Sequence, residues 1–217
     1  EAADVILLDD NFTSIINAID EGRRQFLSIK KFVRYLLRSN AGEVVALVAN
    51  ILIGGPLIFL ATQILWMNLV TDGVTAVALG LEKAEPGQMR HPPRAPASPI
   101  LGRAGVLLIL AFGAYTGCAS LFLFYTILPL APALANTLAF SAMVVFEEMS
   151  VFAFRSLNTP VNRIGWLSNR FLILALTVTL GLQAAAVYVP ALQLLLHTVP
   201  LQAEHWLWIA ALSLPLL

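Results

Sequence analysis

Long apolar runs dominate this chain and restrict it to folds that can cross a lipid bilayer. Hydrophobic residues make up 59% of the 217 residues, and the mean hydropathy is +0.81. This is more apolar than an ordinary soluble domain. A helix of about 20 apolar residues crosses about 30 Å of hydrocarbon. The sequence predicts six spans, with the last one stopping short, as though the chain continued beyond it: 25–53, 57–81, 100–128, 131–154, 171–189 and 204–217.

The basic residues alternate between the connections of these spans. Of the 13 Lys and Arg residues, six lie within 23–38, four within 83–103 and three within 155–170. The opposite connections, 54–56, 129–132 and 190–205, contain none. Basic residues favour the cytoplasmic side. The pattern predicts an all-α membrane protein, a six-helix transmembrane bundle with both ends in the cytoplasm.

The N-terminal segment differs from the rest of the chain. Residues 4–10 read as a short buried strand, and residues 11–39 as an amphipathic helix that continues into the first span. Such a helix could transmit motion, and an amphipathic lead-in at the lipid surface fits the same pattern. Residues 82–99 contain five prolines and are expected to form a cytoplasmic loop.

Four acidic residues lie inside the predicted spans: Glu43, Asp72, Glu147 and Glu148. Each costs about 2.5 to 3.5 kcal/mol on insertion scales, so such residues usually face a partner or an ion pathway. Helical spacing places Asn40 with Glu43 on one face, and Asn68 and Thr71 with Asp72 on another. Oxygen donors of this kind suit Ca²⁺, and also Mn²⁺, Na⁺ or K⁺. The sequence therefore predicts a site for a hard cation.

Other interpretations of the same residues stay open. Asn40 and Asn68 are equally suited to hydrogen bonds between helices. Adjacent Glu147 and Glu148 point about 100° apart on a helix, so one of them is expected to be a protonated or interfacial bystander. Gly73 either loosens the helix beside Asp72 or permits close packing.

Glycine, histidine and cysteine residues have other expected roles. Gly113 and Gly117 form a G-x-x-x-G pair, which is typical of a tight helix contact. The three histidines, His91, His197 and His205, lie in loops or near an interface, and Cys118 is the only cysteine. Softer metals are therefore not expected.

Several motifs occur in order along the first third of the chain. They are LLDDNF at 7–12, EGRRQFLSIKKFVRYLLRSNAGEVV at 21–45 and QILWMNLVTDG at 63–73. The chain resembles the C-terminal part of type II cation-transporting P-type ATPases, closest to the calcium pumps of the sarcoplasmic-reticulum type. The resemblance implies that residues 1–20 are the tail of the phosphorylation domain. It implies that residues 21–217 are the transmembrane domain, with helices five to ten of the family.

The same resemblance implies a set of metal ligands that does not include one of the four acidic residues. The metal ligands would be Asn40, Glu43, Asn68, Thr71, Asp72 and Glu148. Asp72 would bridge two ion sites. Glu147 is an extra carboxylate that is unusual among these calcium pumps, and it puts the alignment at this position in doubt.

The implied activity is ATP-driven export of Ca²⁺ from the cytoplasm with proton counter-transport, the protons entering Glu43 and Glu148. A Mn²⁺ or monovalent-cation pump is an alternative, and an ATP-independent channel or carrier is an alternative of another class. ATP and Mg²⁺ would bind in missing cytoplasmic domains, because the sequence has no D-K-T-G motif. This part alone is expected to be inactive. Its expected partners are the lipid bilayer, the cation and the missing N-terminal helices and domains, and not nucleic acid; short outer loops favour a bacterial plasma membrane.

Overall fold

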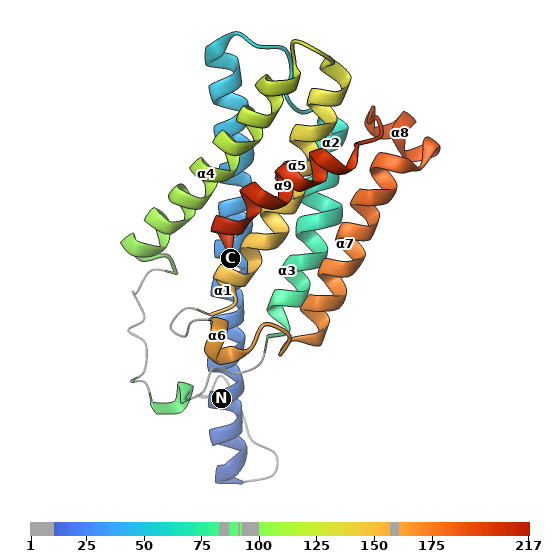
Figure 1. Cartoon of the computed structure of the whole chain (residues 1–217). Helices are drawn as coiled ribbons and strands as arrows, with labels where there is room; N and C mark the ends of the chain where they lie inside the picture. The colour runs from blue at the N-terminus through green and yellow to red at the C-terminus, as the bar shows by residue number, and fades with distance from the viewer. Residues whose placement is uncertain (1–10, 83–86, 91, 93–99, 157–160) are drawn as a thin grey trace.

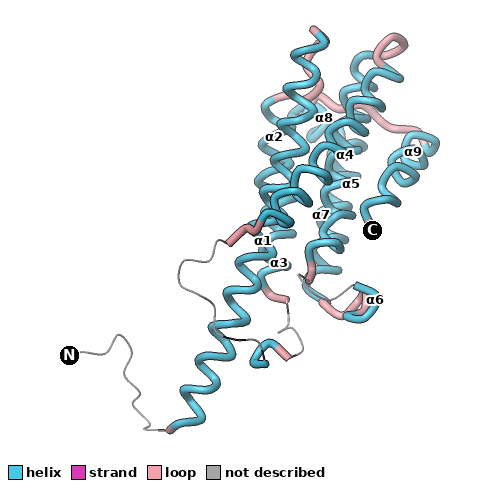
Figure 2. Tube along the Cα trace, turned by 90° about the vertical axis from the view of Figure 1, so that its left-hand side faces the viewer, coloured by secondary structure: helices cyan, strands magenta, loops and turns pink. Residues whose placement is uncertain are grey.

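The chain folds into a bundle of helices. The computed structural model describes residues 11–82, 87–90, 92, 100–156 and 161–217, and these contain helices, turns and loops but no strand. Figure 2 shows the same arrangement from the side, with helices dominating the trace. The strand expected at 4–10 and most of the loop expected at 82–99 lie outside the described residues.

The first helix is the longest element and runs the height of the bundle. It is α1, Phe12–Ile53, with 42 residues. The side chain of Asn11 caps its start by accepting a hydrogen bond from the Thr13 amide at 3.0 Å, and Gly54 ends it in the left-handed region at φ 76°. Only glycine adopts that conformation at little cost. The prediction of one unbroken helix into the membrane segment is confirmed, and α1 extends past the other helices at its N-terminal end (Figures 1 and 2).

The second predicted span is a helix with an irregular middle. It consists of α2, Ala61–Trp66, a π-helical segment η1, Met67–Thr71, and α3, Asp72–Gly80. We refer to residues 61–80 as the broken helix. The loosened turn ends immediately before Asp72, whereas Gly73 sits one residue beyond it. A Cβ added at Gly73 would meet only the Asn68 carbonyl oxygen, at 3.8 Å. The close-packing interpretation of Gly73 is therefore wrong.

The remaining helices follow the predicted spans closely. They are α4 (Arg103–Ile127), α5 (Pro132–Phe154) and α7 (Arg170–Tyr188). Shorter pieces connect or follow them: η2 (Gln88–Arg90), α6 (Val161–Ile164), α8 (Pro190–Leu196), α9 (Ala203–Ser213) and η3 (Leu214–Leu216). Among the described residues, four helices are long and apolar enough to cross a membrane: α1, α4, α5 and α7. The protein is an integral membrane protein.

Small residues bring α1 and α4 into close contact. A Cβ added at Gly113 would lie 2.8 Å from the Ala41 Cβ, and one added at Gly117 would lie 2.7 Å from the Gly42 carbonyl oxygen. A Cβ on Gly42 would lie 2.5 Å from the Thr116 hydroxyl. The G-x-x-x-G pair therefore has the predicted role of a tight helix contact. It fixes α1 against α4 one residue before Glu43.

A short piece of the proline-rich connection is attached to α1. The Gln88 side-chain amide donates to the Asp20 carbonyl oxygen at 3.0 Å and to its Oδ1 at 2.6 Å, and Arg23 Nη1 donates to the Gln88 carbonyl oxygen at 2.9 Å. These bonds join the segment after the broken helix to the N-terminal part of α1.

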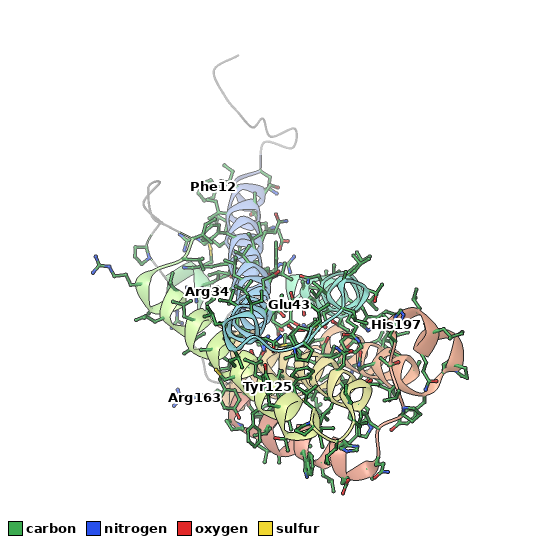
Figure 3. All side chains as sticks on the ribbon, turned by 90° about the horizontal axis from the view of Figure 1, so that it is seen from above. Phe12, Arg34, Glu43, Tyr125, Arg163 and His197 are labelled. Carbon is green, nitrogen blue, oxygen red and sulfur yellow. The ribbon has the colours of Figure 1, made fainter. Side chains whose placement is uncertain are left out.

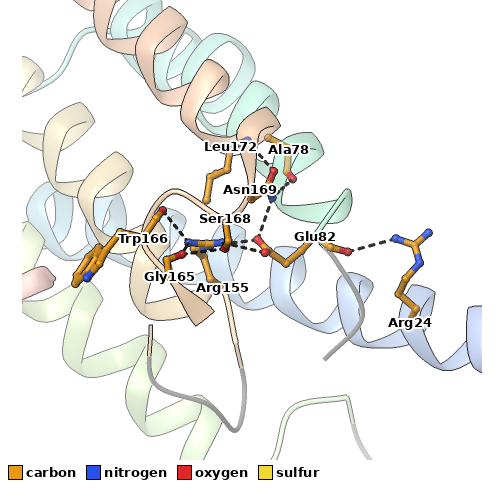
Figure 4. Close-up of polar contacts among 9 residues, drawn as sticks. All are labelled: Arg24, Ala78, Glu82, Arg155, Gly165, Trp166, Ser168, Asn169 and Leu172. Atoms are coloured by element: carbon orange, nitrogen blue, oxygen red, sulfur yellow. Dashed lines mark hydrogen bonds and ion pairs between the residues drawn. The ribbon is translucent and has the colours of Figure 1, made fainter. Parts of the chain in front are cut away.

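A buried ion pair ties together the ends of three helices (Figure 4). Arg155, which follows α5, donates to Glu82, which follows α3, with Nη2···Oε1 at 2.9 Å and Nε···Oε2 at 3.2 Å. Asn169, which caps α7, donates to the same carboxylate at 2.9 Å. Arg24 of α1 donates to the Glu82 carbonyl oxygen at 3.3 Å. We call this cluster the Glu82–Arg155 clasp; it joins the broken helix to α5 and α7.

The clasp gives the first prediction. Arg155→Ala leaves the buried carboxylate of Glu82 without its counter-charge, and breaking a buried pair in this way costs about 3 to 5 kcal/mol. We expect a clearly lower midpoint of thermal unfolding for the protein in detergent. The matched control is Arg163→Ala, because Arg163 is exposed and such changes stay within about 0.5 kcal/mol. Equal midpoints for the two variants would contradict a stabilising role for the clasp.

Candidate cation-binding site

Polar residues line one face of α1 inside the bundle. The buried residues in its middle are Tyr35, Arg38, Ser39, Gly42 and Glu43. Tyr35, Ser39 and Glu43 are four residues apart, with Arg38 and Gly42 beside them, so the five share one broad face of the helix. Tyr35 and Glu43 contact the broken helix and Arg38 contacts α5, whereas Gly42 packs against α4.

Glu43 lies between α1 and the broken helix (Figure 3) and is only 4% exposed. Its two carboxylate oxygens accept hydrogen bonds from the side-chain nitrogen of Asn68, at 3.0 and 2.9 Å. Asn68 belongs to the π-helical segment. An amide carries an oxygen as well as a nitrogen, so rotation of Asn68 would present an acceptor at the same place. Asn68 therefore makes a hydrogen bond between helices in this structure, which is the alternative interpretation of that residue.

Asp72 is fully buried at the point where the π-helical segment returns to α-helix. Its Oδ1 accepts a hydrogen bond from the Tyr35 hydroxyl at 3.0 Å, and its Oδ2 has no partner among the described residues. Thr71 is also buried, but its hydroxyl donates to the Met67 carbonyl oxygen of its own helix at 2.7 Å. The free oxygen of Asp72 faces the interior without a donor.

Both glutamates of α5 are buried completely. Glu148 accepts from the Thr75 hydroxyl at 3.0 and 2.8 Å. Neither oxygen of Glu147 has a hydrogen-bond partner among the described residues. Helix α5 is the most buried of the long helices, so both glutamates are covered by the neighbouring helices. Whether one of them is a protonated or interfacial bystander stays a prediction.

Asn40 does not join the other predicted residues. It is exposed, and its side-chain nitrogen donates to the Leu36 carbonyl oxygen of its own helix at 2.8 Å. Three residues along a helix correspond to a rotation of about 300°, so Asn40 points about 60° away from Glu43. That offset places Asn40 at the edge of the buried face.

Arg38 is a member of this face that the sequence prediction did not include. Its side chain is fully buried, and Nη2 donates to the Phe146 carbonyl oxygen of α5 at 3.0 Å. The signal in the sequence was the spacing of Tyr35, Arg38 and Gly42, which are three and four residues apart and therefore lie on one side of the helix. The basic residues around Arg38 concealed it, because they suggested a solvated face.

The acidic side chains do not form a ready coordination shell. Within the described part of the chain, no three His, Cys, Asp or Glu side chains are close enough together to hold one metal ion. Instead, Asn68, Tyr35 and Thr75 each donate to one carboxylate. Ser39 lies near Asp72 and Glu147, although its hydroxyl forms no hydrogen bond of good geometry. A cation entering this region would have to displace those donors.

Comparison with known proteins connects this arrangement to a family. Residues 56–217 match the family model described as cation transporting ATPase, C-terminus. The chain is 36% identical over 216 residues to a calcium-transporting ATPase of Bacillus subtilis, covering 98% of the chain and 24% of that protein. It is 30% identical over 247 residues to the endoplasmic reticulum calcium ATPase srcA of Aspergillus fumigatus, covering 99% of the chain and 25% of the relative. It is 32% identical over 216 residues to the human calcium-transporting ATPase type 2C member 2, covering 98% and 23%. The chain spans about a quarter of the length of these relatives.

The second prediction concerns Thr75, the donor to Glu148. Thr75→Val keeps the shape but removes the hydroxyl that contacts both carboxylate oxygens. Losing a donor to a buried polar group costs about 1 to 3 kcal/mol, so the midpoint of thermal unfolding in detergent should fall. Thr177→Val is the control, since Thr177 is exposed and bonds only to Ile173 of its own helix. A fall no larger than that of the control would show that the contact contributes nothing.

Proposed function

The chain belongs to the family of cation-transporting ATPases as their C-terminal region, and on this premise we propose that it is the ion-binding transmembrane half of an ATP-driven pump that exports Ca²⁺ from the cytoplasm. One observation carries the proposal. Glu43, Asp72 and Glu148 come from three separate helices and are all buried inside the bundle, with at most 4% exposed. Carboxylates are costly in a membrane interior unless function retains them.

The proposed organisation has six spans, with the broken helix and α9 added to the four long apolar helices. Residues 1–20 would be the tail of the phosphorylation domain and residues 21–217 the transport domain. The N-terminus would be cytoplasmic, because the basic residues gather at one end of the spans. The membrane would be a bacterial plasma membrane. ATP and Mg²⁺ would bind to cytoplasmic domains of the complete pump, and its other transmembrane helices would complete the site.

The proposed ligands are Glu43, Asn68, Thr71, Asp72 and Glu148, and also Asn40, which would have to turn inward from its exposed position at the edge of this face. Their carboxylate, amide and hydroxyl oxygens suit Ca²⁺, which accepts six to eight such ligands in flexible geometry. The π-helical segment supports the proposal, because a local break of this kind places backbone carbonyls off the regular ladder beside Asp72. Mn²⁺ is compatible with the same donors.

Alternating access needs two states that bind the cation with different affinity. In the cation-bound state, the carboxylates would turn from Asn68, Tyr35 and Thr75 toward the ion. In the released state, those donors would satisfy the carboxylates again, as they do in this structure. Glu43 and Glu148 would then take up protons, because a desolvated carboxylate without a cation favours its neutral form. This gives the counter-transport of protons.

The helix α1 would connect the site to the cytoplasmic domains. From Phe12 to Glu43 it rises about 45 Å, at about 1.5 Å per residue. Its N-terminal part is bonded to Gln88 of the loop between the broken helix and α4. A continuous helix of this length can carry a displacement from the cytoplasmic side to Glu43.

A channel or carrier that works without ATP is the second candidate, because buried oxygens can serve passive permeation too. Measuring cation transport by the complete protein in sealed vesicles, with and without ATP, distinguishes the pump from the channel or carrier. ATP-independent cation flux would favour the channel. Cation uptake that requires ATP and moves protons in the opposite direction supports the pump. ATP-dependent uptake without proton movement contradicts the proposed counter-transport of protons.

The third prediction tests the central ligand. In the complete pump, Asp72→Asn should lower Ca²⁺-stimulated ATPase activity at least about tenfold, because it removes a charged ligand. Each of Ca²⁺, Mn²⁺, Na⁺ and K⁺ is tested in turn on both proteins. Glu204→Gln should stay within about twofold, because its side chain is 61% exposed on α9 and such surface changes have small effects. Substantial cation-dependent turnover in Asp72→Asn would exclude Asp72 as a shared ligand.

A further inference from the structure

A glutamine of α7 joins three helices close to the candidate cation site. Gln183 is fully buried. Its side-chain oxygen accepts a hydrogen bond from the indole nitrogen of Trp66 at 3.1 Å, and its side-chain nitrogen donates to the Ser141 hydroxyl of α5 at 3.1 Å. An indole can only donate, so the amide has a single orientation in which Trp66 finds an acceptor. The side chain of Gln183 therefore holds α7, α5 and the broken helix together at one point.

Trp66 lies where the regular helix changes into the irregular one. It is the last residue of α2, and the π-helical segment begins at the next residue, Met67. Asn68, which donates to the carboxylate of Glu43, is the residue after Met67. In the described part of the chain, the side-chain bonds of Gln183 go to residues that are not proposed ligands. Any effect of Gln183 on the cation would therefore pass through Trp66.

Neighbouring helices hold the broken helix on both sides of its π-helical turn. On the α2 side, the Gln63 side chain donates to Asn136 Oδ1 of α5 at 2.7 Å, three residues before Trp66. On the α3 side, Asp72 and Thr75 are bonded to α1 and α5. An α-helix turns by about 100° per residue, so the extra residue of a π-helical turn offsets the faces of the two sides by about that angle. Bonds that fix both faces therefore keep the extra residue in the turn.

We propose that Gln183 is a positioning residue for cation binding, because its bond to Trp66 keeps the π-helical turn beside Asp72 and so keeps Asn68 next to Glu43. This inference rests on the proposed function. Without that bond, the last residue of α2 is free to rotate, and the segment returns toward a regular helix. Asn68 then leaves Glu43, and the affinity for the cation falls. ATP hydrolysis in the cytoplasmic domains is not affected directly.

The test uses the complete pump, with Ca²⁺ as the probe. Trp66→Phe removes the donor and keeps an aromatic ring, whereas Gln183→Met removes the acceptor and keeps a long unbranched side chain. Each variant should raise the Ca²⁺ concentration for half-maximal ATPase stimulation about tenfold, because a buried polar group loses its partner. The maximal rate should stay within about twofold, since binding and not hydrolysis is affected. The double variant should match the single ones, because both remove the same bond.

Two controls separate positioning from packing. Ser141→Ala removes the other partner of Gln183 and leaves the bond to Trp66 in place. Gln193→Met is the matched glutamine control, because the Gln193 side-chain nitrogen donates to the Val187 carbonyl oxygen at 2.6 Å and not to the broken helix. Both controls should keep the half-maximal Ca²⁺ concentration within about threefold, whatever their effect on the midpoint of thermal unfolding.

Several outcomes would overturn the inference. They are an unchanged half-maximal Ca²⁺ concentration in Trp66→Phe, an equal rise in either control, and effects of Trp66→Phe and Gln183→Met that add in the double variant. If one of these two variants does not fold, the other decides. If neither folds while Gln193→Met does, the bond is only structural and the inference is wrong.

Failure of the inference is distinguishable from failure of the proposed function. Absence of Ca²⁺-stimulated ATPase activity in the unmodified pump contradicts the proposed function itself. An active pump whose affinity is unchanged in Trp66→Phe contradicts only the role of Gln183.

Discussion

A carboxylate among membrane helices is stabilised by hydrogen bonds from protein groups, because the surrounding hydrocarbon offers no donor. The contacts between the helices around the site follow from that constraint. Asn68 reaches Glu43 across the α1 interface, Tyr35 reaches Asp72 in the opposite direction, and Thr75 reaches Glu148. Each bond joins two different helices, so satisfying the acids also fixes how the helices face one another.

The π-helical segment of the broken helix lies beside one of these buried carboxylates. A regular helix bonds all its backbone carbonyls internally, which leaves none for a ligand. The π-helical turn at Met67–Thr71 interrupts that pattern directly before Asp72. Such an interruption is tolerated at membrane depth where protein encloses it, and Met67 and Thr71 are both buried. The deviation thus lies beside Asp72, among the proposed ligands.

Periodicity and charge predicted much of this arrangement. The bounds of α4, α5 and α7 follow from uninterrupted apolar runs, and the burial of Glu43 and Asp72 follows from the cost of charge in hydrocarbon. Helical spacing did not predict the exposure of Asn40. Residues three apart differ by about 60° in direction, and the positions of the neighbouring helices decide which of the two side chains is buried. The sequence prediction did not include Arg38, because a basic residue in this segment was expected to face solvent. The position of the π-helical turn depends on packing between helices. Gly73 therefore indicated that the helix is irregular near Asp72, but not that the irregular residues are Met67–Thr71.

Two fixed contacts hold different sets of helices, and the proposed ligands are spread over both sets. The glycine contact at Gly42 and Gly113 ties α1 to α4, and the Tyr125 hydroxyl reinforces it by donating to Asn50 Oδ1 at 2.7 Å. The Glu82–Arg155 clasp ties the broken helix to α5 and α7.

Glu43 lies on the helix held by the glycine contact, and Asp72 and Glu148 lie on helices held by the clasp. The contacts between the two sets at the site are side-chain hydrogen bonds, which re-form at small cost when a helix shifts. A displacement of α1 would change the spacing between Glu43 and the other two carboxylates, and it would also act on the bond from Arg24 to Glu82 of the clasp. A site whose carboxylates come from different helices can change its affinity for a cation while each helix stays folded.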